Sequence, residues 1–398
     1  MQEPKPGDPI VIVGAARTPM GGFQGELSGA TAPSLGAVAI AAALERAGVA
    51  AETVDEVLMG CVLPAGQGQA PARQAAFGAG LPKEVPATTL NKMCGSGMKT
   101  VMVATDQLRA GNGSVVVAGG MESMTNAPYL VPKMRAGARI GHAQMMDHMF
   151  LDGLEDAYDK GRLMGTFAED CAEHYQFTRE AQDQYALASL EGALTAEREG
   201  RFEAEIAPVT VTGRKSSAVI AADEQPRKAR PDKIPTLKPA FRDGGTVTAA
   251  NASSISDGAA ALVLMRQSEA EAQGLSPRAR IVAHASYAQE PGWFTTAPIP
   301  AMQRAIERAG WGAEDVELWE INEAFAVVPM AAMRELGIPR ERLNVNGGAC
   351  ALGHPIGASG ARIVVTLLHE MERQGLTRGV ASLCIGGGEG TALAIERI

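Results

Sequence analysis

Cysteine is scarce in this 398-residue sequence, and its spacing argues against several classes of site. The five cysteines are Cys61, Cys94, Cys171, Cys350 and Cys384. Their number is odd, they lie far apart, and none belongs to a CxxC pair. Zinc sites and disulfide frameworks both need closer or paired cysteines. We therefore expect thiols that act individually in a reducing cytoplasm, and no bound metal.

The sequence also lacks a basic tract and a long apolar run. The net charge is −9, so nucleic acid is a poor candidate partner, although a local basic patch could still bind an anionic cofactor. No apolar run reaches the length of a membrane span. Residues 1–9 are polar and show no secretory signal. We expect a cytoplasmic protein without a membrane partner.

Aromatic residues make up only 4% of the chain, whereas hydrophobic residues make up 46% and glycine occurs 46 times. This composition is typical of a globular protein with closely packed helices and sheets and many tight turns. The length exceeds that of one ordinary hydrophobic core, so two or three domains are expected.

An internal repeat divides the chain. The run from Leu44 to Val54 (LERAGVAAETV) resembles the run from Ile306 to Val316 (IERAGWGAEDV), and a strand-like segment follows each. In the first copy a strand is expected over 9–15 and a helix over 33–47, which Thr31 or Ser34 would cap at its start and Gly48 at its end. A second strand is expected over 54–59.

The repeat predicts two similar α/β halves separated by an unrelated region. The first half comprises residues 1–124 together with 253–276, and the second comprises 277–398. Residues 125–252 form an insertion that contains four methionines between 134 and 149 and a helix beginning at Thr178.

Cys94 lies in the segment NKMCGSGMK, at a turn from a strand into a helix expected over 95–110. The free N–H groups and partial positive charge of a helix start favour a thiolate, so we expect a lowered pKa and a nucleophile. Gly95 and Gly97 would let a substrate approach the backbone closely. The alternative is a buried structural cysteine.

His354 lies in a second glycine-rich turn, NGGACALGHPIGASG. Pro355 and the surrounding glycines suit a fixed base or oxyanion donor. The alternative is a histidine that only caps a turn.

Two further segments carry candidate groups. Cys384 ends a strand and is followed by three glycines whose N–H groups suit an anion, although a tight structural turn is the alternative. Asn322 follows the strand of the second half, where it could hold a water or simply cap a helix that begins near Ala324. A nucleophile, a base and oxyanion donors are together what a Claisen reaction between thioesters needs.

Over nearly its whole length the sequence resembles the thiolase family. The resemblance rests on the order and spacing of AARTPMGGF, NKMCGSGMK, VVVAGGMESM, TVTAANASSISDGAAA, NEAFAV, NGGACALGHPIGASG and CIGGGEGTALA. It implies an α/β, five-layered α-β-α-β-α fold of two duplicated βαβαβαββ halves plus a loop domain for CoA binding and oligomerisation. It also implies an acyltransferase that condenses acyl-CoA with acetyl-CoA, or cleaves 3-oxoacyl-CoA, through an acyl-cysteine.

The resemblance assigns catalytic roles to five residues. Cys94 would be the acylated nucleophile. His354 would activate it and line one oxyanion hole with a water held by Asn322. Cys384 would be the acid/base at the substrate α-carbon, and the N–H groups of Cys94 and Gly386 would form the second hole.

The same resemblance implies substrate contacts and partners. Acetyl-CoA, 3-oxoacyl-CoA and free CoA would be substrates or products, with no separate cofactor, and the assembly would be a homotetramer formed by two dimers. The implied contacts with CoA or the acyl group are Leu154, Met164, Arg227, Phe241, Ala249, Ser253, Phe294 and Phe325.

Three positions depart from the short-chain members of the family. Leu163 replaces a usual histidine after a one-residue insertion, Phe294 stands where methionine is frequent, and Ile255 stands for leucine. We still expect a short-chain, acetoacetyl-CoA-like substrate. The alternatives are a degradative thiolase for a broader range of chains, a decarboxylating ketoacyl synthase, which Cys384 argues against, and a non-catalytic acyl-CoA-binding member.

Overall fold

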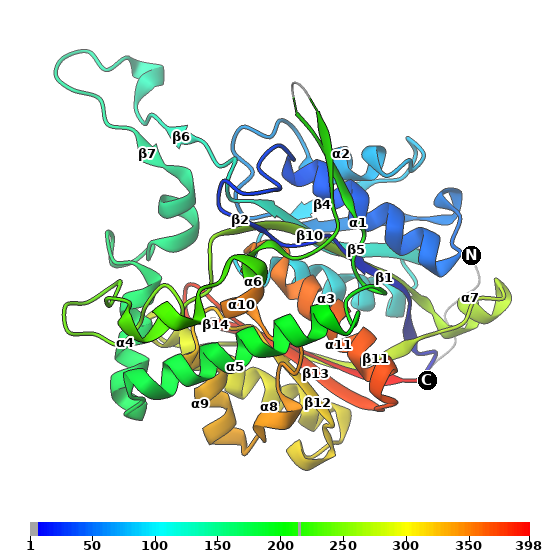
Figure 1. Cartoon of the computed structure of the whole chain (residues 1–398). Coiled ribbons are helices and arrows are strands. Elements are labelled where there is room, and N and C mark those ends of the chain that lie inside the picture. The colour runs from blue at the N-terminus through cyan, green and yellow to red at the C-terminus, as the bar shows by residue number, and fades with distance from the viewer. Residues whose placement is uncertain (1–6, 214–215) are drawn as a thin grey trace.

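The computed structural model describes residues 7–213 and 216–398 (Figure 1). Most of the predicted polar start, residues 1–6, lies outside the described residues. Among those that are described, no helix is long and apolar enough to cross a membrane.

The first half of the chain supplies one side of a continuous ten-stranded sheet. Its strands lie in the order β4-β3-β5-β10-β1, with β3 parallel to β4 and β5 and the last three antiparallel. β5 and β10 are buried along their whole length, which explains their apolar sequences without alternation. The bounds are β1 Ile10–Arg17, β3 Glu56–Gly60, β4 Ala87–Leu90, β5 Val115–Ser123 and β10 Ser256–Arg266, with the short β2, Gly21–Gly22, beside β10.

The second half continues the sheet on the other side of β1, in the order β11-β14-β13-β12. Counted outward from the junction, these strands correspond to β1, β10, β5 and β3 of the first half. A single parallel bridge from Trp319 to Leu343 takes the place of the outermost strand. The halves join where β1 pairs with β11, and the predicted duplication of βαβαβαββ units is confirmed. The bounds are β11 Ala279–Ala288, β12 Leu318–Ile321, β13 Arg378–Ile385 and β14 Glu389–Arg397.

Helices make three layers around the two halves of the sheet (Figure 1). α1 and α2 cover the outer face of the first half, and α8 and α9 cover that of the second. α3 and α11 lie between the halves and share one apolar core, which completes the predicted five layers. The bounds are α1 Ala32–Ala47, α2 Pro71–Gly78, α3 Ser96–Arg109, α7 Gln267–Ala272, α8 Pro298–Ala309, α9 Val327–Leu336, α10 Ala349–Leu352 and α11 Ser359–Gln374.

The caps of α1 confirm the sequence prediction. The hydroxyl of Thr31 accepts a hydrogen bond from the backbone N–H of Ser34, and Gly48 ends the helix in the left-handed region at φ 67°. Both features satisfy backbone groups that a helix end leaves unpaired.

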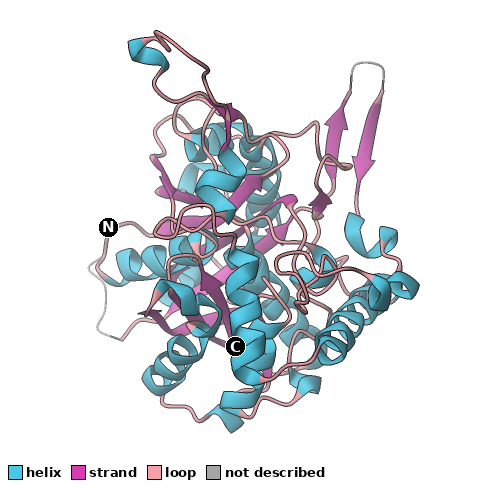
Figure 2. Ribbon diagram, turned by 90° about the vertical axis from the view of Figure 1, so that its left-hand side faces the viewer, coloured by secondary structure: helices cyan, strands magenta, loops and turns pink. Residues whose placement is uncertain are grey.

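The inserted region, residues 125–252 of the sequence, lies outside the large sheet. It forms two small hairpins and three helices: β6 Tyr129–Leu130, β7 Met146–Asp147, α4 Met164–Tyr175, α5 Arg179–Arg198, β8 Val209–Thr212, β9 Ser217–Ile220 and α6 Glu224–Lys228. The segment 129–147, here called the arm, extends away from the body, and the β8–β9 hairpin projects separately (Figures 1 and 2). The domain boundaries proposed from the sequence remain a prediction.

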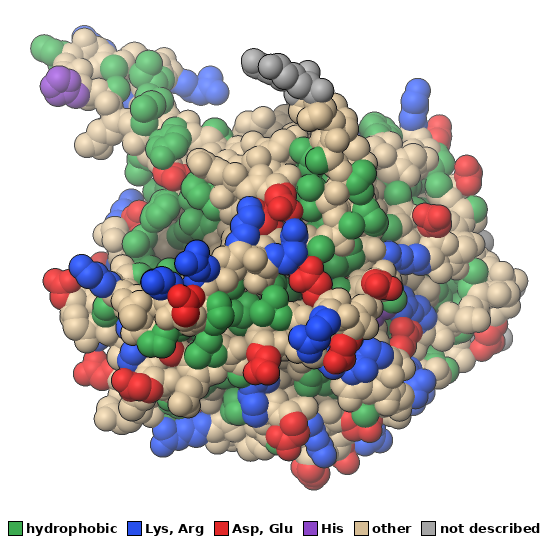
Figure 3. All heavy atoms as spheres, viewed as in Figure 1, with side chains coloured by type: hydrophobic (Ala, Val, Ile, Leu, Met, Phe, Trp, Pro, Cys, Tyr) green, Lys and Arg blue, Asp and Glu red, His purple; other side chains and the backbone are tan. Residues whose placement is uncertain are grey.

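Apolar side chains are visible on the arm and on the surface next to it (Figure 3). Ile140 is 94% exposed and Met145 is 71% exposed, whereas Met149 is buried. The methionines of this region therefore divide between an exposed surface and a packed base.

Candidate active site

Cys94 lies in a tight turn between β4 and α3. The hydroxyl of Ser96 accepts a hydrogen bond from the N–H of Lys92 at 2.8 Å and donates to the carbonyl of Met93 at 2.6 Å. Met93 has φ 47°, which is rare for a residue that is not glycine. The turn therefore holds the thiol in a fixed position directly before the helix.

Glycines bring the starts of α3 and α11 together. A Cβ atom on Gly97 would lie 2.8 Å from the backbone nitrogen of Ala361, and one on Gly360 would lie 2.4 Å from that of Met98. Both separations are shorter than carbon atoms tolerate, so only glycine permits this approach. The contact places the turn of Cys94 next to the turn of His354.

The imidazole of His354 is oriented by Ser359, at the start of α11. Its Nδ1 lies 2.6 Å from Oγ of Ser359, and this Oγ lies 2.9 Å from the carbonyl of Pro355. A hydroxyl has one proton, so when Ser359 donates to the carbonyl, Nδ1–H of His354 donates to Ser359. Nε2 then carries the lone pair and is the nitrogen that can accept a proton.

Asn322 lies over the same imidazole. Its backbone N–H donates to the carbonyl of Ser382 at 2.9 Å, which fixes the end of β12 beside β13. Its Nδ2 lies 3.4 Å from both ring nitrogens of His354. The alternative role as a helix cap is wrong, because α9 begins at Val327 and its cap position is Ala326.

Cys384 lies near the end of β13 and is fully buried. Its pKa is raised well above the ordinary value, first by burial and then by the nearby Cys94. Two residues later, Gly386 turns its backbone N–H to the thiol of Cys94.

The predicted low pKa of Cys94 is not what the structure shows. Burial raises it to about 11, although hydrogen bonds from the N–H groups of Gly386 and of Cys94 itself act in the opposite direction. Desolvation of the thiolate outweighs the helix start. Cys94 is therefore a thiol at neutral pH and needs a base.

One cavity of about 290 Å³ unites most of the predicted site. Part of its wall is a single π turn, Phe150–Leu154, a form often found at functional sites. Leu163 and Ile255, the departures noted in the sequence, also line it. The predicted residues that line it are Cys94, His354, Gly386, Leu154, Met164, Phe241, Ser253, Phe294 and Phe325.

Phe294 belongs to the wall of this cavity and is only 3% exposed. Its ring meets those of Phe167 and Phe325 edge to face, with centroids 6.3 and 6.4 Å apart. It therefore packs under the 291–296 turn and also faces the cavity.

Two predicted contacts do not line this cavity. The guanidinium of Arg227 is turned to Glu26 at 2.9 Å and to the carbonyl of Asp223. Ala249 lines a second cavity of about 230 Å³. The two cavities share one segment, because Ser253 and Ser254 are adjacent and line the first and the second respectively.

Two buried residues beside the site, Ser359 and Glu122, were not predicted from the sequence. Glu122 accepts hydrogen bonds from the N–H groups of Val62 at 2.9 Å and Gly357 at 3.0 Å, so it connects both halves beside His354. Burial raises its pKa to about 7. A lone acidic residue in the apolar run VVVAGGMES was the available signal for Glu122. The serine of the GHPIGAS segment was the signal for Ser359.

The described residues contain no group of three or more His, Cys, Asp or Glu side chains arranged to hold a metal ion.

Comparisons with known proteins agree with this geometry. The model of the thiolase N-terminal domain matches residues 10–268, and that of the C-terminal domain matches residues 275–397. An acetyl-CoA acetyltransferase of Cupriavidus necator is 52% identical over 98% of this chain and 99% of its own length. Acetyl-CoA acetyltransferase 2 of Arabidopsis thaliana is 52% identical over 97% and 96%.

Solved structures give the same result. The crystal structure of the Bacillus anthracis acetyl-CoA acetyltransferase is similar to this chain with a TM-score of 0.95 and 43% identity, and the match covers 98% of this chain and 99% of the other. The chain therefore belongs to the thiolase family of acyltransferases.

Proposed function

We propose that this thiolase condenses two molecules of acetyl-CoA to acetoacetyl-CoA and free CoA, and catalyses the reverse cleavage. The observation that carries the proposal is the meeting of Cys94, His354 and Gly386 at one apolar cavity. Cys384 does not line this cavity, but it lies two residues before Gly386 and near enough to Cys94 for that thiol to raise its pKa. The names of the similar acetyltransferases support the short acyl chain.

In the first half-reaction Cys94 takes the acetyl group. Nε2 of His354 accepts the thiol proton, which a thiol of pKa about 11 does not lose unaided. The thiolate attacks the thioester carbonyl, and the N–H groups of Cys94 and Gly386 stabilise the oxyanion. The bond to CoA sulfur breaks, and the departing CoA thiolate takes the proton of Cys384. The products are acetyl-Cys94, free CoA, a Cys384 thiolate and a His354 imidazolium.

In the second half-reaction a new carbon–carbon bond forms. The Cys384 thiolate removes a proton from the methyl group of a second acetyl-CoA, for which its raised pKa suits it. The imidazolium of His354, with a water held by Asn322, stabilises the enolate oxygen. The enolate carbon attacks the acetyl group, Cys94 leaves as a thiolate, and His354 returns its proton.

The second cavity is the proposed site of the phosphate end of CoA. Lys228, Arg230 and Lys233 line it together with apolar residues such as Leu237 and Ala249. Arg230 is exposed and meets its nearest carboxylate, that of Asp232, only at 3.9 Å. Cations beside an apolar slot suit a phosphorylated nucleoside. Arg227 and Lys228 are paired with the carboxylates of Glu26 and Glu224. Arg230 and Lys233 are therefore the proposed contacts of the phosphates.

The test is covalent labelling. Brief incubation with acetyl-CoA followed by peptide mass spectrometry should find an acetyl group on Cys94, and none in Cys94→Ala. Cys171→Ala is the matched control and should keep the label, because Cys171 lines neither cavity. An acetyl group on Cys384 alone would contradict the assignment.

A further inference from the structure

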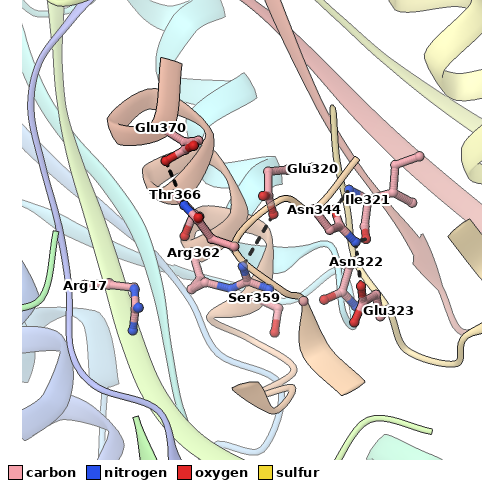
Figure 4. Close-up of polar contacts among 12 residues, drawn as sticks. Arg17, Glu320, Ile321, Asn322, Glu323, Asn344, Ser359, Arg362, Thr366 and Glu370 are labelled. Atoms are coloured by element: carbon pink, nitrogen blue, oxygen red, sulfur yellow. Dashed lines mark hydrogen bonds and ion pairs between the residues drawn. The ribbon is translucent and has the colours of Figure 1, made fainter. Parts of the chain in front are cut away.

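A buried ion pair lies behind the proposed site. Arg362 of α11 and Glu320 of β12 are each 1% exposed, and Figure 4 shows the guanidinium pointing to the carboxylate. Their closest atoms, Nη1 and Oε2, are 3.6 Å apart, which is too long for a hydrogen bond. Among the described residues, neither carboxylate oxygen of Glu320 and neither Nη atom of Arg362 has a hydrogen-bond partner.

This geometry is a poor way to stabilise a fold. Burying two charges costs more than their attraction returns unless hydrogen bonds satisfy them. The same protein contains a well-made buried pair for comparison, because Arg17 lies 2.6 Å from Glu205 and 2.7 Å from Asp223. The pair of Arg362 and Glu320 therefore calls for a reason other than stability.

The position of the pair supplies such a reason. Glu320 lies on β12 two residues before Asn322, which directly follows the end of that strand, and Arg362 is three residues after Ser359 on the same helix. Among the described residues, Asn322 and Ser359 are the two whose side chains make polar contacts with the imidazole ring of His354. Each member of the pair thus belongs to an element that holds one side of His354.

The guanidinium also acts on His354 through its charge. Burial and the positive charge of Arg362 lower the pKa of His354 to about 3, so the imidazole is neutral and its Nε2 is unprotonated, although the same shift makes the ring a weaker base. Burial raises the pKa of Glu320 to about 8 against the attraction of Arg362. The other charged groups that act on the pair, from the elements around it, are Arg17, Glu205, Glu323 and Glu370.

We propose that Arg362 and Glu320 are positioning residues, which hold β12 against α11 so that Asn322 and Ser359 fix the orientation of the His354 ring. The inference rests on the proposed function of His354 as the base for Cys94. It adds to that function a buried pair of ionisable side chains, neither of which lines the first cavity.

The experiment compares Arg362→Lys, Arg362→Met and the double variant Glu320→Met with Arg362→Met. The control is Arg278→Met, which removes a cation paired with Glu372 further along α11. The measurements are the thermal midpoint, kcat and KM for cleavage of acetoacetyl-CoA, and the pH dependence of alkylation of Cys94 by iodoacetamide. Alkylation needs no substrate, so it reports on His354 even if the proposed reaction fails in the wild type.

In Arg362→Met we expect kcat to fall about 10–100-fold with little change in KM, since small displacements of a catalytic group have effects of this order. The acidic limb of the alkylation profile should move to higher pH, because loss of the cation makes the imidazole easier to protonate. Arg362→Lys should keep the limb near that of the wild type. The double variant should recover the thermal midpoint of the wild type, because replacing both members of a buried ion pair by apolar side chains leaves no buried charge unpaired. It should recover neither kcat nor the wild-type position of the acidic limb.

Recovery of kcat and of the wild-type limb in the double variant would show a purely structural pair and overturn the inference. A limb that moves equally in Arg362→Lys, or in the Arg278→Met control, would overturn it as well. A wild type that does not cleave acetoacetyl-CoA but shows the expected alkylation profiles would contradict the proposed function alone.

Discussion

Replacement of Ser359 by alanine should slow the reaction without preventing folding. The change removes the Oγ that lies 2.6 Å from Nδ1 of His354 and leaves this nitrogen facing Nδ2 of Asn322 at 3.4 Å, which is also a donor. An unsatisfied buried polar group costs about 1–3 kcal/mol. The penalty falls mainly on the imidazolium formed when Cys94 loses its proton. At about 1.4 kcal/mol for each factor of ten, kcat should fall roughly 5–150-fold.

The matched control is Ser382→Ala. Ser382 is equally buried, and its hydroxyl donates to the carbonyl of Thr391 at 2.8 Å without touching His354. Steady-state cleavage of acetoacetyl-CoA should show a lower kcat and a nearly unchanged KM in Ser359→Ala only. A loss below twofold, or an equal loss in both variants, would refute the role assigned to Ser359.

Four further outcomes are expected. Cys384→Ser should still acquire an acetyl group on Cys94 but lose about 10²–10⁴-fold in condensation, because a hydroxyl is a far poorer base; condensation within tenfold of wild type would make Cys384 structural. Phe294→Met should raise kcat/KM for 3-oxodecanoyl-CoA relative to acetoacetyl- and 2-methylacetoacetyl-CoA, by a graded amount of about 1–3 kcal/mol at most, and unchanged ratios would refute the pocket assignment. Arg230→Ala with Lys233→Ala should raise KM for acetyl-CoA but not for S-acetyl-pantetheine, and an equal rise for both would place the phosphates elsewhere. Light scattering at micromolar concentration should give the mass of a tetramer, in which the exposed apolar surface of the arm is covered, and a monomeric mass would contradict this assembly.

The sequence predicted the fold well where signals were local or repeated. The runs after Leu44 and Ile306 revealed the duplication, and Thr31 and Gly48 marked the ends of α1 because caps depend on a few neighbouring residues. The arm could not be foreseen as an exposed segment, because methionines serve packed cores and exposed contacts equally.

The sequence indicates which residues are candidates for the site, but not the electrostatic environment that surrounds them. Glycine-rich turns indicated Cys94, His354 and Cys384. Desolvation depends on everything packed around a group, so the direction predicted for the pKa of Cys94 was wrong. The turn of Arg227 toward Glu26 likewise arises from a contact between residues far apart in the chain.

The close contact between the starts of α3 and α11 at Gly97 and Gly360 also shows that the two duplicated halves contribute different groups to the proposed site. The proposed nucleophile, Cys94, lies before the middle-layer helix α3 of the first half, and the proposed base, His354, lies before the corresponding helix α11 of the second. Two identical copies would have presented the same group twice at this junction. The two halves therefore bring unlike groups to this contact, and each half supplies only part of the proposed site.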